Sequence, residues 1–160
     1  MLTPTLKTLT PKKLLGINLT MSLANNKTGQ LWKQFGPQIK NISNSVSTAT
    51  ISMQVYDADY YKNFSPVKEF TKWAAVEVEN FDEIPVGLSS FVLEGGLYAV
   101  FDYKGSSADP SIFHYIFQEW LPKSDYVIDN RPHFEVLGEK YANNDVESEE
   151  EIWIPIVKRG

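Results

Sequence analysis

Cysteine is absent from all 160 residues of the sequence. This absence excludes disulfide bonds, thiolate catalysis and cysteine-based metal sites, and it is typical of cytoplasmic proteins, where we expect this one to work. The start of the chain has no basic segment followed by an apolar run. Nor does any stretch approach the roughly 18 apolar residues of a membrane span, so we expect neither a secretory signal nor a membrane anchor.

Positive charge is also scarce. The 15 Lys and Arg residues are outnumbered by 20 Asp and Glu residues, which gives a net charge of -5. No basic cluster is longer than Pro11-Lys12-Lys13, so we expect no direct contact with the phosphate backbone of a nucleic acid. With 42% hydrophobic residues, residues 1–160 are expected to form one domain that buries roughly two-thirds of its unfolded surface.

The familiar catalytic motifs are missing as well. The sequence has no glycine-rich phosphate loop, no nucleophile elbow and no His-Glu-x-x-His pattern. Its two histidines, His114 and His133, fall on a predicted helix and at the start of a predicted strand. We therefore expect no metal site and no cofactor.

Hydrophobic patterning predicts a mixture of strands and helices. One helix follows Thr28 as its N-cap, with a kink at Pro37, and a second follows Asp109-Pro110 and stops at Pro122. Six segments have the composition or alternation of strands: 13–20, 51–56, 70–78, 96–103, 133–138 and 151–157.

The predicted elements occur in the same order twice. Each half, about 1–80 and 81–160, reads strand, helix, strand, strand, although no repeat is visible residue by residue. Two such βαββ modules predict an α+β fold with both helices on one side of a largely antiparallel sheet. A ligand would then have either the opposite face or the seam between the halves.

Glu135 is the acidic residue of most interest, because it interrupts the apolar strand Phe134-Glu135-Val136-Leu137. Alternation places it on the face opposite Phe134 and Val136. Two interpretations remain open. On a solvated face the glutamate is ordinary, whereas in an aromatic cleft its carboxylate needs a cationic or strongly hydrogen-bonding partner.

Aromatic residues make up 13% of the chain, and several fall on predicted strands, where they could line a cleft or pack in the core. Trp153 is the better placed of these, since Ile152, Ile154 and Ile156 share one strand face and send Glu151 and Trp153 to the other. The acidic run from Glu147 to Glu151 is interpreted as a solvated loop.

The second half of the sequence resembles the GyrI-like family. This family comprises the effector-binding domains of AraC-type and MerR-type transcription regulators and stand-alone proteins related to the DNA gyrase inhibitor. The resemblance rests on the order and spacing of five segments: 84–88, 93–101, 120–122, 134–135 and 151–156. It implies a pair of βαββ modules in a pseudo-twofold arrangement with a central ligand groove.

The resemblance also implies site residues. In multidrug-binding relatives, a buried glutamate on the penultimate strand pairs with cationic aromatic compounds, and it corresponds to Glu135. An aromatic residue near the start of the second helix corresponds approximately to Phe113. Tyr56, Trp73 and Trp153 are added as ligand-binding candidates on the basis of strand face alone.

Three hypotheses for the function follow. The first is a stand-alone protein that binds hydrophobic, cationic aromatic compounds for drug or toxin sensing or sequestration. The segment before Lys13 is too short for a helix-turn-helix, which disfavours a one-chain regulator. The second is a hydrolase that opens cyclopropane-type electrophiles with Glu135 as general base, as some relatives do. The third is a protein-interaction module like the gyrase inhibitor.

Overall fold

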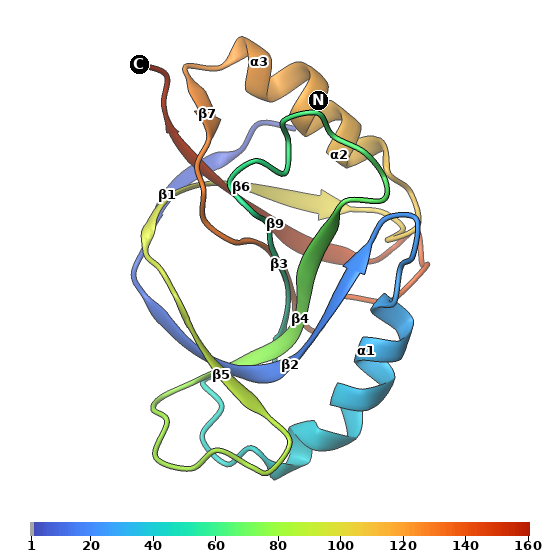
Figure 1. Ribbon diagram of the computed structural model, residues 1–160, viewed down its shortest axis with the longest axis vertical. Coiled ribbons are helices and arrows are strands. Elements are labelled where there is room, and N and C mark those ends of the chain that lie inside the picture. Colours follow the sequence, from blue (N-terminus) through green and yellow to red (C-terminus); the bar gives the residue numbers. More distant parts are fainter. Residues whose placement is uncertain (1) are drawn as a thin grey trace.

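A curled antiparallel sheet organises the chain, as the computed structural model in Figure 1 shows for residues 2–160, the part of the chain that is described. Nine strands lie in these residues. They are β1 (Thr5–Leu9), β2 (Lys12–Ser22), β3 (Thr50–Val55), β4 (Glu69–Val78), β5 (Ser89–Leu93), β6 (Gly96–Lys104), β7 (Tyr126–Ile128), β8 (His133–Leu137) and β9 (Glu149–Lys158).

Two helical segments cover one face of this sheet. The first is α1 (Thr28–Phe35), which continues as the 3₁₀ helix η1 (Gly36–Asn41). The second is α2 (Ser111–Tyr115), which runs through the π-helical turn η2 (Ile116–Trp120) into α3 (Leu121–Lys123). None of the helices in the described residues is long and apolar enough to cross a membrane.

An Asn or Asp side chain bonds to the first residue of each helix, although neither N-cap residue makes a side-chain cap bond. Thr28 is the first helical residue rather than the N-cap we expected, and its amide donates to Asn26 Oδ1 at 2.9 Å. In the second helix the Ser111 amide donates to Asp109 Oδ1 at 3.0 Å, and Pro110 is the N-cap. The second helix ends at Lys123, one residue past the stop that we predicted at Pro122.

The strand order is symmetric about the centre of the sheet. It runs β1-β6-β9-β8-β3-β4-β2-β5, with β7 paired to the outer part of β9. The first half contributes β2, α1, β3 and β4, and the second contributes β6, α2, β8 and β9, which confirms the predicted pair of βαββ modules. The two modules meet where β3 pairs antiparallel with β8.

The first strand of each half crosses to the other half, which the sequence did not predict. β1 pairs with β6, and β5 pairs with β2. Both strands have five residues, and most of those residues are exposed because the strands form the sheet edges. Their mostly exposed residues and weak alternation explain why periodicity missed them, and the three-residue strand β7 was missed as well.

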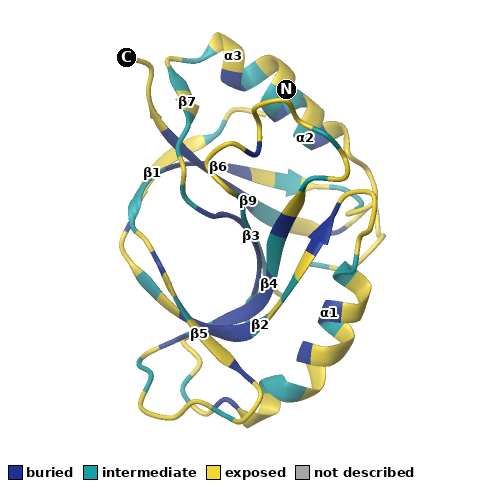
Figure 2. Cartoon of the chain, viewed as in Figure 1, coloured by how far each residue is buried: buried dark blue, intermediate teal, exposed yellow. Residues whose placement is uncertain are grey.

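Three hydrophobic clusters form the core (Figure 2). The sheet curls around the inner cluster, which includes Leu14, Met53, Tyr98 and Phe134. On the helix-bearing face, one cluster packs Leu31 and Phe35 of the first helix against β2 and β4. The other packs α2, η2 and α3 against β6 and β9. Each large apolar side chain buried in this way contributes roughly 1.5–3 kcal/mol.

Gly16 is the tightest position in the sheet and gives a test of this packing. It lies on β2 opposite Ala75 of β4, and a Cβ atom there would lie 2.8 Å from the Ala75 Cα and would clash with the Ala74 carbonyl oxygen. Because both obstacles are backbone, we expect Gly16→Ala to lower the free energy of unfolding by about 2 kcal/mol, measured by urea denaturation.

Gly29→Ala is the matched control. Gly29 lies in the first turn of α1, and outside its chain neighbours and its own helix backbone nothing lies within 4 Å of a Cβ atom placed there. This substitution is expected to leave stability unchanged or to raise it by up to about 1 kcal/mol. Equal effects of the two substitutions would contradict the close approach of β2 to β4.

Candidate functional site

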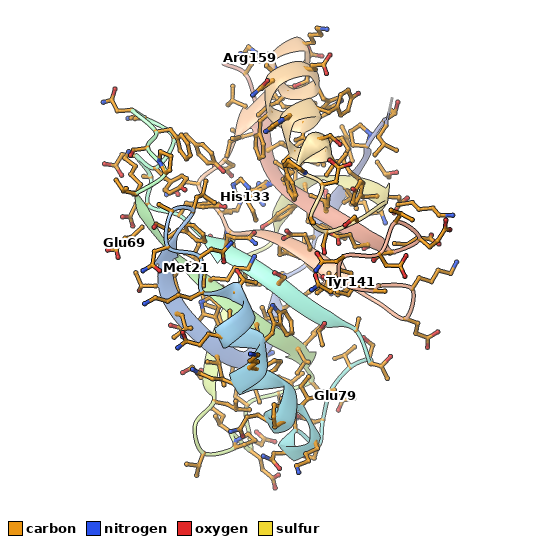
Figure 3. The ribbon with its side chains drawn as sticks, turned by 90° about the vertical axis from the view of Figure 1, so that its right-hand side faces the viewer. Met21, Glu69, Glu79, His133, Tyr141 and Arg159 are labelled. Carbon is orange, nitrogen blue, oxygen red and sulfur yellow. The ribbon has the colours of Figure 1, made fainter. Side chains whose placement is uncertain are left out.

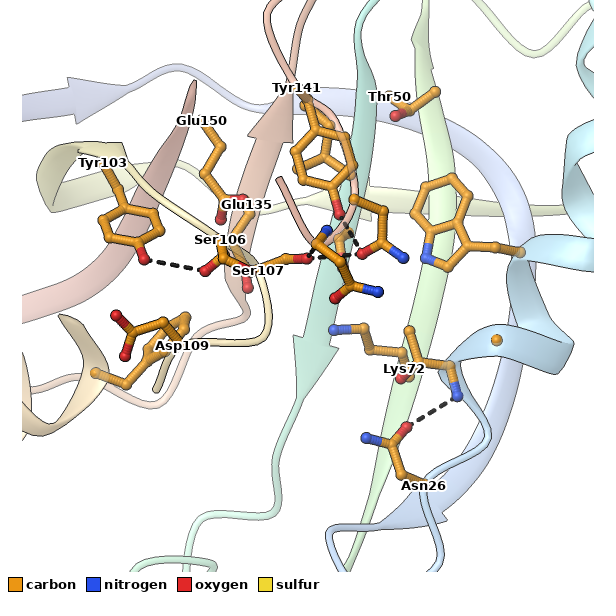
Figure 4. A pocket seen from close by; sticks show the side chains of 18 residues that line it. Asn26, Thr50, Lys72, Tyr103, Ser106, Ser107, Asp109, Glu135, Tyr141 and Glu150 are labelled. Carbon is orange, nitrogen blue, oxygen red and sulfur yellow. Dashed lines mark hydrogen bonds between the residues drawn. The ribbon is translucent and has the colours of Figure 1, made fainter. Parts of the chain in front are cut away.

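A cleft of about 690 Å³ opens on the helix-bearing face, between the starts of α1 and α2 (Figure 3). This volume lies within the range of about 300–1,000 Å³ that is typical of small-molecule sites. Strands β3, β4, β8 and β9 form its floor, and the close-up in Figure 4 shows the side chains that line it. The cleft therefore lies over the seam between the two βαββ modules.

Three charged residues, which we call the charged floor, line the bottom of this cleft: Lys72 of β4, Glu135 of β8 and Glu150 of β9. Strand alternation directs them to the helix-bearing face. The register places Glu135 beside Ser52 of β3, which is small and leaves space above the floor. All three residues lie deep in the fold but keep partial exposure through the cleft.

Gln54 connects Lys72 to Glu135. With its amide oriented to satisfy both atoms, it donates to Glu135 Oε2 at 3.2 Å and to the His133 carbonyl oxygen at 3.1 Å, and its oxygen accepts from Lys72 Nζ. Burial raises the pKa of Glu135, while the charge of Lys72 and the Gln54 hydrogen bond lower it. The buried carboxylate thus has internal partners on one side only, the side of β3 and β4.

Glu150 adds a second carboxylate to the same floor. Burial, and then the negative charge of Glu135, raise the pKa of Glu150 to about 7, and the charge of Lys72 opposes this shift. Two carboxylates and one ammonium give the charged floor a net charge of -1 when all three groups are ionised. The floor is therefore suited to receive one positive charge.

Aromatic side chains form the walls of the cleft. Trp32 stands on α1 at one side, and Phe113 stands on α2 at the other. Tyr103 of β6 and Tyr141 of the loop after β8 add two further rings. The arrangement combines flat apolar surfaces with a negative floor.

The rim between α2 and β9 is held by a polar network in two loops. Ser107 Oγ and the Tyr141 hydroxyl both donate to Asn143 Oδ1, at 2.7 and 3.2 Å. The Asn144 amide donates in turn to Ser107 Oγ at 2.9 Å. These bonds tie the loop before α2 to the loop before β9, so the cleft wall on this side is pre-formed.

Tyr56 lies beside the cleft rather than among the residues that line it. It belongs to an aromatic cluster two residues along β8 from Glu135, formed by Tyr56, Tyr60, Tyr61, Phe70, Phe117 and His133. Burial is the main cause of the raised pKa of Tyr56, and the nearby charge of Glu135 raises it further. Burial lowers the pKa of His133 to about 3, so this histidine is neutral near pH 7.

Trp73 and Trp153 are not brought to the cleft. Trp153 stacks on Phe134 with ring centroids 5.1 Å apart, and Trp73 packs on Phe91 at 5.2 Å, both in the inner cluster on the opposite face of the sheet. As expected, strand β9 directs Trp153 to one face of the sheet and Ile152, Ile154 and Ile156 to the other. The helix-bearing face, however, is the face that carries Glu135 and the cleft, so these two tryptophans lie on the opposite face of the sheet from it.

The structure therefore brings Glu135 and Phe113 together in one cleft. It also places Lys72, Glu150 and Trp32 there, which the sequence did not single out. For Lys72 and Glu150, the strand pattern contained a signal. Lys72 interrupts the alternation of Phe70 and Ala74, and Glu150 is in phase with the isoleucines of β9. In residues 2–160, no three His, Asp or Glu side chains gather closely enough to hold a metal ion.

Several solved structures share this fold. An integron cassette protein from Vibrio cholerae, VCH_CASS2, superposes with a TM-score of 0.69 at 13% identity, covering 97% of this chain and 96% of that one. SAV2435, solved bound to tetraphenylphosphonium, gives 0.70 at 18% identity, with coverages of 96% and 93%. The C-terminal domain of EcmrR gives 0.73 at 13% identity and covers 99% of both chains.

Identities this low establish the likeness of fold alone. No curated protein sequence matches the chain. A match to a sequence family does cover most of it, from residue 5 to residue 156. The chain therefore belongs to the family of integron-associated effector binding proteins, Cass2, and has the GyrI-like fold that its sequence predicted.

Proposed function

We propose that the cleft binds hydrophobic cations that carry aromatic rings, and that the protein serves to sense or sequester such compounds. The charged floor is the observation that carries this proposal. Glu135 and Glu150 face the cleft with Lys72 as their shared internal cation, so one negative charge is left for a ligand. A ligand cation would offset the desolvation that burial imposes on the carboxylates.

The walls suit the rest of such a ligand. Trp32 and Phe113 offer apolar ring faces on opposite sides of the floor. Stacking and cation–π contacts with such rings contribute roughly 0.5–2 kcal/mol each. The binding of tetraphenylphosphonium by SAV2435, which shares the fold, is consistent with a ligand of this class. The hydrolase and protein-interaction hypotheses remain predictions from the sequence.

Removing the charge of Glu135 tests the proposal. Glu135→Gln keeps the shape and a hydrogen bond to Gln54 but removes the negative charge, so we expect the Kd for tetraphenylphosphonium to rise at least about tenfold, or 1.4 kcal/mol. Quenching of tryptophan fluorescence reports binding. Of the four tryptophans, which all lie among the described residues, only Trp32 lines the cleft.

Glu139→Gln makes the same change of charge at an exposed residue two positions beyond the end of β8, outside this cleft. The Kd of this variant for tetraphenylphosphonium is expected to stay within about twofold of the Kd of the unsubstituted protein, because exposed charges interact weakly across water. Equal affinity of the Glu135→Gln protein and the unsubstituted protein would refute the role of Glu135.

Glu150 predicts a dependence of affinity on pH. With a pKa of about 7 in the free protein, it is mostly protonated at pH 6 and mostly ionised at pH 8. A bound cation favours the ionised form and lowers this pKa, so binding releases a proton at acidic pH. The Kd for tetraphenylphosphonium, whose charge does not change with pH, should therefore rise by up to about tenfold from pH 8 to pH 6.

The variant Glu150→Gln should flatten this profile, since it has no proton to release at this position. His133 does not contribute in this range, because its pKa is held at about 3. Titration calorimetry at three pH values measures the effect for both proteins. An affinity that is constant with pH in the unsubstituted protein would show that Glu150 does not face the bound cation.

A further inference from the structure

Lys72 has a second chemical capacity, which cation binding does not use. It is a primary amine on the floor of a cleft large enough for a small organic molecule, and Figure 4 shows its side chain reaching into that space. It comes from the middle of β4, where Thr71 and Trp73 pair with β2 and β3 on either side. The base of the side chain is therefore held by a central strand, and a ligand can reach the amine only from the cleft.

The surroundings of this amine favour its neutral, nucleophilic form more than bulk water does. Burial is the largest effect on the pKa of Lys72 and lowers it, although Glu135 and Glu150 act in the opposite direction. The Gln54 oxygen accepts a hydrogen bond from Nζ and so orients the amine. Lysines withdrawn from water in this way are the ones that attack carbonyl carbons in proteins.

A proton carrier lies in the same cleft. The pKa of Glu150 is about 7, so near neutral pH this group exists in both its acid and base forms. Glu150 belongs to the same charged floor as Lys72, and the charge of Lys72 lowers the pKa of Glu150. Amine addition to a carbonyl needs first a base and then an acid, and Glu150 can serve in both roles.

We propose that Lys72 captures aldehydes with aromatic rings as a covalent imine in this cleft. The inference goes beyond reversible cation binding and depends on the same site. Trp32 and Phe113 would hold the ring of the aldehyde, while its carbonyl group points to the floor. A stored or sensed ligand of this class would be bound by a reversible covalent bond.

The reaction balances without an oxidant or reductant. The Lys72 ammonium passes a proton to the Glu150 carboxylate, and the neutral amine attacks the carbonyl carbon, whose oxygen takes up a proton. The proton on that oxygen comes from the attacking nitrogen, which leaves a neutral carbinolamine. The carbinolamine loses its hydroxyl group as water when Glu150 returns the proton. The nitrogen lone pair forms the C=N bond, so aldehyde and ammonium give a protonated imine and one water molecule.

Reductive trapping tests the proposal in the unsubstituted protein. Benzaldehyde and sodium cyanoborohydride convert an imine into a stable benzyl-lysine, which intact mass and peptide mapping detect. At limiting aldehyde, we expect Lys72 to carry at least about tenfold more label than exposed Lys104, because the aromatic walls of the cleft hold the aldehyde beside the Lys72 amine. Even labelling of the surface lysines, with Lys72 unmodified, would overturn the proposal.

Two variants test whether the label depends on the Lys72 amine. Lys72→Arg keeps the positive charge but removes the nucleophile, and should abolish the dominant label, whereas Lys104→Arg should leave it intact. If Lys72→Arg fails to fold by circular dichroism, the peptide map of the unsubstituted protein still decides. A folded Lys72→Arg protein that is labelled to the same extent as the unsubstituted one would also overturn the proposal.

Tetraphenylphosphonium separates this inference from the proposed function. If it binds and protects Lys72 from labelling, both hold. If it binds but Lys72 is never labelled in its absence, imine formation fails and cation binding stands. If Lys72 is labelled but the cation does not bind, the imine holds and the cation proposal fails.

Discussion

Strands β3 and β8 pair along the middle of the sheet, and their register determines where polar groups can lie. Gln54 faces His133 and Ser52 faces Glu135 across this pairing. On either side of it, the same face of the sheet is covered by a helix and its apolar cluster. At the His133 end of the seam, Tyr61 and His133 connect the two clusters, because both contact Phe117. At Ser52 and Glu135, by contrast, the side chains are polar and line the cleft. The site is thus a consequence of joining two βαββ modules through their central strands.

The cost of this arrangement is electrostatic. A buried carboxylate is unfavourable unless it is paired, and here two carboxylates share one lysine, while Gln54 bonds to Glu135 alone. Replacing Lys72, Glu135 and Glu150 by apolar residues of similar volume would remove this cost, and such replacements of buried ion pairs are often neutral or stabilising. Their presence makes sense if the floor is arranged for a ligand. The polar bonds among Ser107, Tyr141 and Asn143 hold the rim in place before a ligand arrives.

Most of the fold was predictable from the sequence, because six of the nine strands in residues 2–160 and both helices are specified by local periodicity. β1 and β5 were missed, since their partners lie in the other half of the chain and their residues are mostly exposed. Alternation alone predicted that Glu135 and Phe134 face opposite ways, but it could not tell which face carries the helices. Trp73 and Trp153 were assigned to the cleft for this reason. Glu150 was assigned to a solvated loop, although strand β9 already begins at Glu149.

A crystal structure of the complex with tetraphenylphosphonium would locate the bound charge relative to the charged floor. The phosphonium centre is expected to lie above Glu135 and Glu150, with its phenyl rings against Trp32 and Phe113. A cation bound elsewhere, such as among Trp73, Trp153 and Phe134 on the inner face of the sheet, would contradict this expectation.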